Sequence, residues 1–215
     1  MHPHPFLEER TWMEDYDNQV LQQAQDLCKV LNLVYQAKRI LWIDPFFTRK
    51  KIGSDECRFG LDVVAFPGWM RKRLEPTEWR PLIASSLIFR KLLARQMPWG
   101  VWLTAFVTFW IMVIGGGILG TLFGSNARIP FLFYTLFVAV PFVANRVKQA
   151  WKKQSLKADL LSTKVVEKEA FLSVLRKIDG MGLKDVIHTE KRGLSRHFSS
   201  KPSVAERISY LSRSV

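Results

Sequence analysis

Few residues of this chain have the type and spacing that a reaction centre needs. The four histidines include no pair at positions i and i+4, the spacing that lets two imidazoles on one helix face bind zinc. They are His2, His4, His188 and His197. Cys28 and Cys57 lie far apart and outside any C-x-x-C pattern. We therefore expect neither a cysteine zinc site nor a disulfide framework, and we expect two reduced thiols that fill apolar space.

Two adjacent serines, Ser85 and Ser86, are the next candidates for chemistry. They lie in the run LIASSLIFRKLLAR, which has the apolar spacing of a helix. A serine becomes a nucleophile beside a general base, and no histidine is close to this pair in sequence. Hydrogen bonding within the helix is the expected role of both hydroxyls. Serine catalysis and a metal site at the histidines named above stay open as alternatives.

The elements that position these residues surround a long apolar block. The 215 residues carry a formal charge of +13 and are 48% hydrophobic, yet 32 uncharged residues separate Arg95 from Arg128 and 17 separate Arg128 from Arg146. At about 1.5 Å per helical residue, the run 98–123 exceeds the ~30 Å hydrocarbon core of a bilayer, and the run 129–144 reaches about 24 Å. The short GSNAR segment joins them. We predict a transmembrane helical hairpin; a buried hairpin in the core of a soluble protein is the alternative.

The flanking charges predict how the hairpin is oriented. Basic residues precede the first run and follow the second, and one arginine lies between them, so both chain ends are expected to be cytoplasmic. Residues 1–96 and 146–215 are interpreted as two halves of one cytoplasmic domain, interrupted by the hairpin at 97–145. The predicted location is a bacterial inner membrane. Five side chains are expected at the membrane interface: Arg95, Trp99, Trp102, Arg146 and Trp151.

Three glycines recur every four residues in the first apolar run. Gly116, Gly120 and Gly124 would share one helix face and allow another helix to approach closely. Packing within the hairpin is the first interpretation. A homo-oligomer or a membrane protein partner is the alternative.

The excess of basic residues could indicate nucleic-acid binding or an anionic lipid surface. The basic residues gather at 71–95 and 146–177, on both flanks of the apolar block, and aromatic residues do not alternate with them as a base-stacking surface requires. Headgroups attract such residues at about 1 kcal/mol each. We expect the lipid bilayer as a partner and no nucleic acid.

The remaining chain predicts an α+β fold that is mainly α-helical, with a small antiparallel sheet. Short runs rich in β-formers are RILWID, 39–44, and FGLDVVAF, 59–66. Helical spacing covers 15–37, the stretch from about 77 into the first apolar run, 147–162 and 167–178. A capping box, Ser203 with Glu206, opens a last short helix.

This order of elements resembles the HtpX-type membrane zinc metalloproteases, relatives of the CAAX prenyl protease family. In that family a short helix precedes a helix that carries H-E-x-x-H. The corresponding text here is PGWMRKRLEPTEWRPLIASSLIF, and the motif falls on Ser85, Ser86, Leu87, Ile88 and Phe89.

Two further stretches contribute to the resemblance. The family's E-x-x-x-D, on the helix after the hairpin, corresponds to Ser155 and Asp159. Its Ser-Thr-His-Pro-Pro followed by Glu-Arg-Ile corresponds to SSKPS, in which Lys201 replaces the histidine, followed by ERI at 206–208. The resemblance implies a zincin-like domain split by the hairpin.

The departures from the family fall on its zinc site. The resemblance places the two histidine ligands at Ser85 and Phe89, the general base at Ser86 and the third ligand at Ser155; Asp159, in the family a residue that orients a ligand, is retained. A protonated hydroxyl is a poor zinc ligand and a phenyl ring is none. We therefore expect no metal, no cofactor and no catalytic residue.

The functional expectation is a membrane-anchored pseudo-metalloprotease that binds protein, as a regulator or a subunit of a membrane complex. One alternative is an active metalloendopeptidase whose zinc ligands come from unrecognised positions or another chain. A structural, lipid-anchored component of a larger complex is another. The resemblance also implies a substrate groove along FGLDVVAF as an edge strand, which we expect Phe89 and Trp79 to narrow or block.

Overall fold

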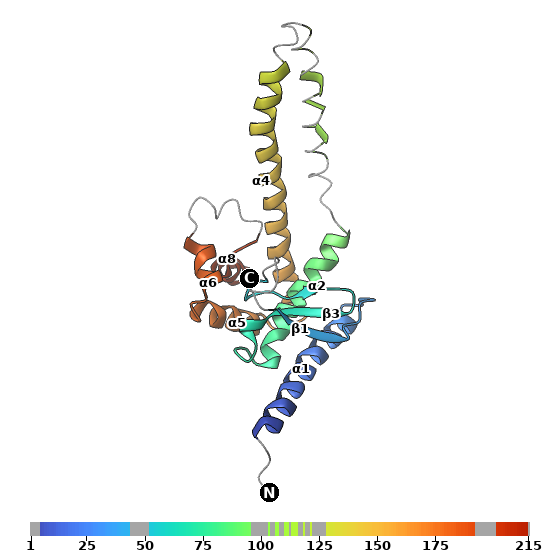
Figure 1. The fold of residues 1–215 in the computed structure, drawn as a ribbon, viewed down its shortest axis with the longest axis vertical. Coiled ribbons are helices and arrows are strands. Elements are labelled where there is room, and N and C mark those ends of the chain that lie inside the picture. Colours follow the sequence, from blue (N-terminus) through green and yellow to red (C-terminus); the bar gives the residue numbers. More distant parts are fainter. Residues whose placement is uncertain are drawn as a thin grey trace.

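The computed structural model describes residues 5–43, 52–95, 128–191 and 201–214, together with 103, 106, 107, 110, 111, 113–115, 118 and 121. Figure 1 shows a body of helices around a small sheet, from which helix α4 rises well beyond the rest. A mainly helical fold with a small sheet is thus confirmed.

Helix α1, Pro5–Val30, begins and ends earlier than its apolar spacing predicts. Val20, Ala24 and Leu27 form the buried stripe of this helix. The helix ends because Asn32 adopts a left-handed conformation, with φ at 53°, and the Leu33 N–H donates to the Cys28 carbonyl. Val34, expected on the helix, therefore lies in the following loop and is fully exposed.

The sheet is mixed, which corrects the expectation of an antiparallel one. Its strands are β1, Arg39–Ile43; β2, Arg58–Phe59; and β3, Val63–Pro67, in the order β1-β3-β2. β3 pairs parallel with β1 and antiparallel with β2. Residues 44–62, which include β2, separate β1 from β3 in sequence, and a connection of this length allows parallel pairing. β3 is thus the central strand, and the expectation that FGLDVVAF forms an edge is wrong.

The predicted helices keep their order along the chain, but α4 joins the predicted runs 129–144 and 147–162 into one helix, and α6 has no counterpart among the predicted helices. After the 3-10 turns Gly68–Met70 and Pro76–Glu78 come α2, Trp79–Arg95; α4, Arg128–Ser162; α5, Lys168–Gly180; α6, Lys184–Lys191; and α8, Val204–Arg213. Pro81 lies in the first turn of α2, where its missing N–H removes no helical bond. The capping box at the start of α8 is confirmed: the Ser203 hydroxyl accepts from the Glu206 N–H at 3.2 Å.

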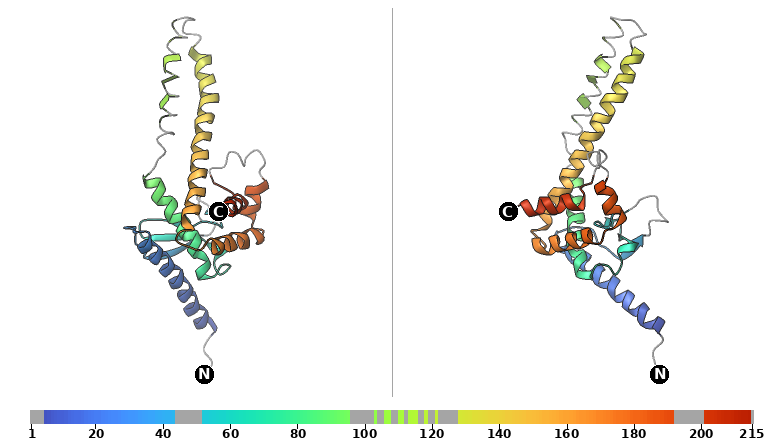
Figure 2. Two further views of the ribbon diagram at one scale, coloured as in Figure 1. Left: turned by 180° about the vertical axis from the view of Figure 1, so that it is seen from behind. Right: turned by 90° about the vertical axis from the view of Figure 1, so that its left-hand side faces the viewer.

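Both ends of the chain contribute to one buried core. Trp79 and Phe66 pack edge to face with ring centroids 4.8 Å apart, and the same cluster includes Phe171 and Leu211 from the carboxyl-terminal helices. In the left-hand view of Figure 2, α5, α6 and α8 lie on one side of α4, and most of the sheet with the upper end of α1 lies on the other.

The expected transmembrane hairpin is contradicted. Across the part of the chain that the structure describes, no helix combines the length and the apolar character needed to cross a bilayer. In α4 the apolar run passes directly into the basic residues that begin at Arg146. The expected integral-membrane location in a bacterial inner membrane is corrected for the same reason.

Several residues assigned to the membrane cannot be placed. Trp99, Trp102, Gly116, Gly120 and Gly124 lie outside the described residues. The other three expected interface residues are placed on helices. Arg95 is the last residue of α2, Arg146 is exposed on α4, and Trp151 is 37% exposed on α4.

Candidate functional site

The positions that correspond to the family's zinc motif converge on the contact between α2 and α4. The Ser85 hydroxyl donates to the Asp159 carboxylate at 2.5 Å, and the rings of Phe89 and Trp151 lie 6.0 Å apart. As the numbering rises along α2 it falls along α4, so the two helices are antiparallel here. Trp151, Ser155 and Asp159 follow at four-residue intervals and share one helix face. Ser155 thus belongs to the same contact, which we call the α2–α4 seam.

A guanidinium group from the last helix binds Asp159. Arg207 donates from Nε to Oδ2 at 2.8 Å and from Nη2 to Oδ1 at 2.7 Å, a two-point contact that fixes the carboxylate plane. Asp159 is fully buried and Arg207 is 4% exposed. The face of Arg207 lies 5.5 Å from the Phe171 ring centroid. The carboxylate therefore has a permanent cationic partner in the protein itself.

The same arginine continues the network to a second buried carboxylate. Its Nη1 donates to Asp55 Oδ2 at 2.7 Å and to the Asp55 carbonyl at 2.9 Å. Lys201 donates to the other oxygen, Oδ1, at 2.7 Å and approaches Glu56 at 3.0 Å. We call the five residues Ser85, Asp159, Arg207, Asp55 and Lys201 the ion network.

Charge pairing decides the ionisation of the network. Burial opposes a negative charge on Asp55, but the nearby Lys201 and Arg207 cations outweigh that cost and hold the pKa of Asp55 well below its ordinary value. Burial likewise disfavours the charged form of Lys201, and the carboxylates of Asp55 and Glu56 outweigh it and raise its pKa. Asp55 is thus a carboxylate and Lys201 a cation at neutral pH, and the two side chains form a buried ion pair.

The second serine of the pair has a different environment. Ser86 is half-buried, and its hydroxyl accepts from the Cys57 N–H at 3.5 Å. Burial raises the pKa of the Cys57 thiol to about 12, although the hydrogen bond with Ser86 acts in the opposite direction. Because the thiolate is the reactive form, Cys57 is an unreactive filler, in agreement with the expectation for both cysteines.

The side chains of the seam do not fit a zinc ion. Zinc takes neutral imidazoles, thiolates or carboxylates, and the corresponding positions carry Ser85, Phe89 and Ser155. Asp159 supplies a carboxylate at the seam, but both of its oxygens already accept hydrogen bonds from Arg207. In the part of the chain that the structure describes, no group of three His, Cys, Asp or Glu side chains could hold a metal ion. His2, His4 and His197 lie outside the described residues, and His188 lies on α6 with an undescribed side chain.

Serine catalysis is also disfavoured by the geometry. Ser85 donates to Asp159, and both oxygens of that carboxylate already accept hydrogen bonds from Arg207. Ser85 is 6% exposed, so a substrate carbonyl would have to enter the α2–α4 seam to reach it.

The structure joins some of the sequence-predicted positions and separates others. Ser85, Phe89, Ser155 and Asp159 meet at the seam, and Lys201 reaches them through Asp55 and Arg207. Trp79 does not line a groove. It is fully buried and donates from Nε1 to the Tyr16 hydroxyl at 3.0 Å, because its indole fills the core between α1 and the sheet.

Two residues of the network were not singled out from the sequence. Arg207 enters the family resemblance only as the arginine of ERI, 206–208, to which the resemblance gives no role. Its position with Val204 and Leu211, at i, i+3 and i+7 on the buried face of α8, was a signal that a cation would need a buried carboxylate. Asp55 lies in a loop whose sequence has no regular pattern, and no signal pointed to it.

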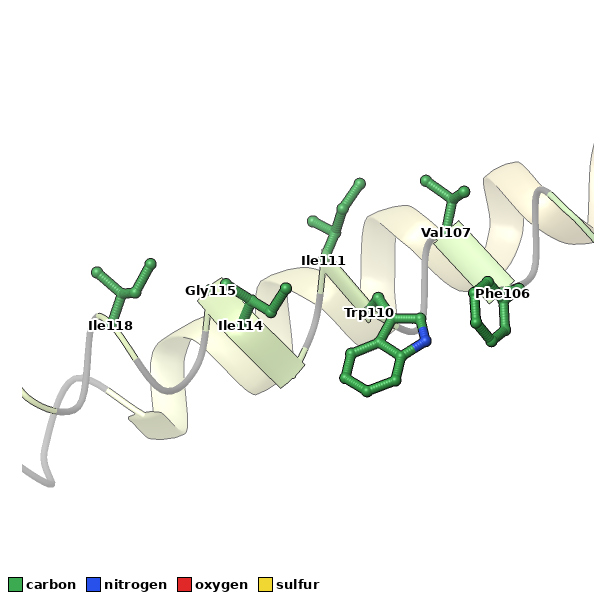
Figure 3. A pocket seen from close by; sticks show the side chains of 7 residues that line it. All are labelled: Phe106, Val107, Trp110, Ile111, Ile114, Gly115 and Ile118. Carbon is green, nitrogen blue, oxygen red and sulfur yellow. The ribbon is translucent and has the colours of Figure 1, made fainter.

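One apolar hollow lies away from the seam. Its volume is about 560 Å³, and it is lined by Gly115 and by apolar side chains between Phe106 and Ile118 (Figure 3). None of its lining side chains can titrate or coordinate a metal, so it carries no chemistry.

Comparisons with known proteins add no identification. No family model, no curated protein and no solved structure matches the chain. The peptidase and metalloprotease assignment therefore has no support from them, and it rests on the motif correspondence alone.

Proposed function

We propose that this chain is a non-catalytic relative of the HtpX-type metalloproteases and that it acts by binding another protein. The observation that carries the proposal is the position of Asp159. The motif correspondence assigns Asp159 to the surroundings of a zinc ligand, and in this chain its partners are a serine hydroxyl and a guanidinium.

The ion network supports a structural use of these positions. It links four segments that are distant in sequence: α2 through Ser85, α4 through Asp159, α8 through Arg207, and the loop before β2 through Asp55. A zinc ion in the relatives would lie between the two corresponding helices. Here the Arg207 guanidinium supplies a fixed positive charge beside the seam and leaves no open position at which water could be activated.

β1 is one of the two edge strands of the sheet, and its outer edge is the one that we assign to a protein partner. Among the described residues, β3 is the strand that pairs with β1, on one side of it. Leu41 is 52% exposed and Arg39 is exposed, which leaves this strand open to the solvent. An extended segment of another protein could add to this edge through backbone hydrogen bonds.

Metal content and cleavage test the non-catalytic part of the proposal. We expect the purified full chain to contain no stoichiometric zinc and to leave an unfolded protein intact, with or without a chelator. We expect the variant Ser85→His, Ser86→Glu, Phe89→His, Ser155→Glu to bind one zinc ion, because it supplies the donors that the seam lacks. The same four positions changed to Ala form the matched control. Stoichiometric zinc or chelator-sensitive cleavage in the natural chain would contradict the proposal.

Site-specific crosslinking tests the binding part. A photoreactive amino acid at Leu41, introduced in the cells that make the protein, should give a discrete protein adduct. The same group at Arg176, exposed on α5, is the control. No adduct at Leu41, or the same adducts at both positions, would rule out β1 as the binding edge.

A further inference from the structure

Two loop tips and one turn of α2 form a surface that combines cations with exposed aliphatic side chains. Arg90 donates to the Gly60 carbonyl at 3.1 Å, and Lys91 donates to the Leu31 carbonyl at 2.8 Å. These bonds attach the loop after α1 and the loop before β3 to the same turn of α2. The Arg90 guanidinium also lies 5.1 Å from the Tyr35 ring centroid, which brings the two loops closer together.

The aliphatic side chains of these loops are unusually open to solvent. Val34 is 101% exposed, Leu61 is 95% exposed and Val30 is 61% exposed. Single exposed aliphatic residues are common, but three of them gathered beside two cations form a patch that favours a partner with both charged and apolar groups. We call Val30, Val34, Leu61, Arg90 and Lys91 the Arg90 face.

Most charges around this face are positive; the acidic exception is Asp62, which follows Leu61 and pairs with Arg39 at 3.8 Å. Arg90 and Lys91 donate these hydrogen bonds to backbone carbonyls. Helix α2 contains no acidic residue, and α4 contains none before Asp159, whereas both carry several Lys and Arg residues. A positive field that extends over two helices matches an extended anionic surface better than a discrete acidic patch on a protein.

We propose that the Arg90 face binds an anionic lipid surface. Arg90 and Lys91 contact phosphate and carboxylate headgroups, while Val34 and Leu61 enter the apolar boundary below them. The contact concerns this face of the body and is distinct from the corrected expectation of a spanning hairpin. It is also independent of the proposed protein binding at β1.

Vesicle flotation of the full chain tests this proposal. We expect binding to phosphatidylcholine vesicles that contain phosphatidylserine, weaker binding to phosphatidylcholine alone, and loss of the difference at high salt. The double variant Arg90→Gln, Lys91→Gln should bind the anionic vesicles roughly 10- to 30-fold more weakly. The double variant Arg176→Gln, Lys184→Gln removes the same charge from exposed positions on α5 and α6, and it should bind like the natural chain.

A second variant distinguishes lipid from other polyanions. Val34→Ser with Leu61→Ser changes side chains that touch little of the protein, so the fold is retained, and we expect several-fold weaker vesicle binding because less apolar surface is buried in the bilayer. Equal binding to neutral and anionic vesicles, or an equal loss in the α5–α6 control, would overturn the proposal. Retention on heparin without vesicle binding would also overturn it, and would point to a soluble polyanion. None of these results bears on zinc content or crosslinking.

Discussion

At the scale of single residues, the buried charged side chains of this protein pair with one another. Asp55 and Asp159 are buried carboxylates, and both are bound by Arg207. A buried ion pair contributes little net stability compared with an apolar replacement, but removal of one partner leaves a buried charge unpaired. The network is therefore sensitive to substitutions that remove one member.

The pH dependence of stability should report on Asp55. Its pKa is lower in the folded state than the unfolded value of about 3.9, so its stabilisation is complete above about pH 4 and is lost as pH falls toward the folded pKa. We expect Asp55→Asn to lower the free energy of unfolding by about 3–5 kcal/mol at pH 7, because Arg207 loses a partner. Below about pH 4 the difference in free energy of unfolding between the natural chain and Asp55→Asn should narrow by about 1.4 kcal/mol per pH unit.

Urea unfolding of the natural chain and of Asp55→Asn between pH 3 and 7 measures this difference in free energy of unfolding. One unit of pKa difference corresponds to about 1.4 kcal/mol. Asp26→Asn, in a side chain that is 46% exposed beside Lys29, is the control and should change stability by less than about 0.5 kcal/mol. A difference for Asp55→Asn that stays constant down to pH 3 would mean that another group carries the linkage.

At the scale of elements, the α2–α4 seam determines where the site lies. Its antiparallel arrangement follows from two contacts, Ser85 with Asp159 and Phe89 with Trp151. The resemblance predicts that Phe89 narrows or blocks a substrate groove. In the structure its ring is half-buried and packs toward Trp151 on the neighbouring helix.

A double-mutant cycle on Phe89 and Trp151 should measure this packing. We expect Phe89→Ala and Trp151→Ala to show a coupling energy of about 0.5–1.5 kcal/mol, the range of aromatic pairs in contact. The cycle of Phe89→Ala with Tyr210→Ala, an exposed residue on α8, is the control and should be additive within about 0.5 kcal/mol. Equal coupling in both cycles would exclude a specific ring contact.

At the scale of the whole molecule, the sequence predicts the order of the helices and strands better than it predicts which strands pair or which side chains are buried. Apolar spacing identified α5, and the capping box identified α8, because those signals are local. The direction of β3 relative to β1 depends on the path of a connection without a regular pattern, and the burial of Trp79 depends on the sheet above it. No local sequence pattern predicts either the direction of β3 or the burial of Trp79. The ion network is hardest to foresee because Asp55 and Arg207 are 152 residues apart.

A split-chain experiment tests whether residues 1–96 and residues 146–215, the pieces on either side of the long apolar block, form one folded body. The core joins Trp79 and Phe66 with Phe171 and Leu211, and the ion network connects Ser85 and Asp55 of the first piece with Asp159 and Arg207 of the second. We expect residues 1–96 and 146–215 to lack cooperative unfolding when each is made alone, because each exposes half of a shared core. Made together, they should co-purify in equal amounts and unfold as one unit.

The substitution Arg207→Leu in the second piece should weaken this association at least 100-fold, because two buried carboxylates lose their shared cation. Arg213→Leu, on the last turn of the same helix and exposed, is the matched control and should associate like the natural sequence. Cooperative unfolding of either piece alone would show that the body consists of two independent units. Equal association of the two variants would show that apolar contacts join the pieces and that the ion network selects their register without holding them together.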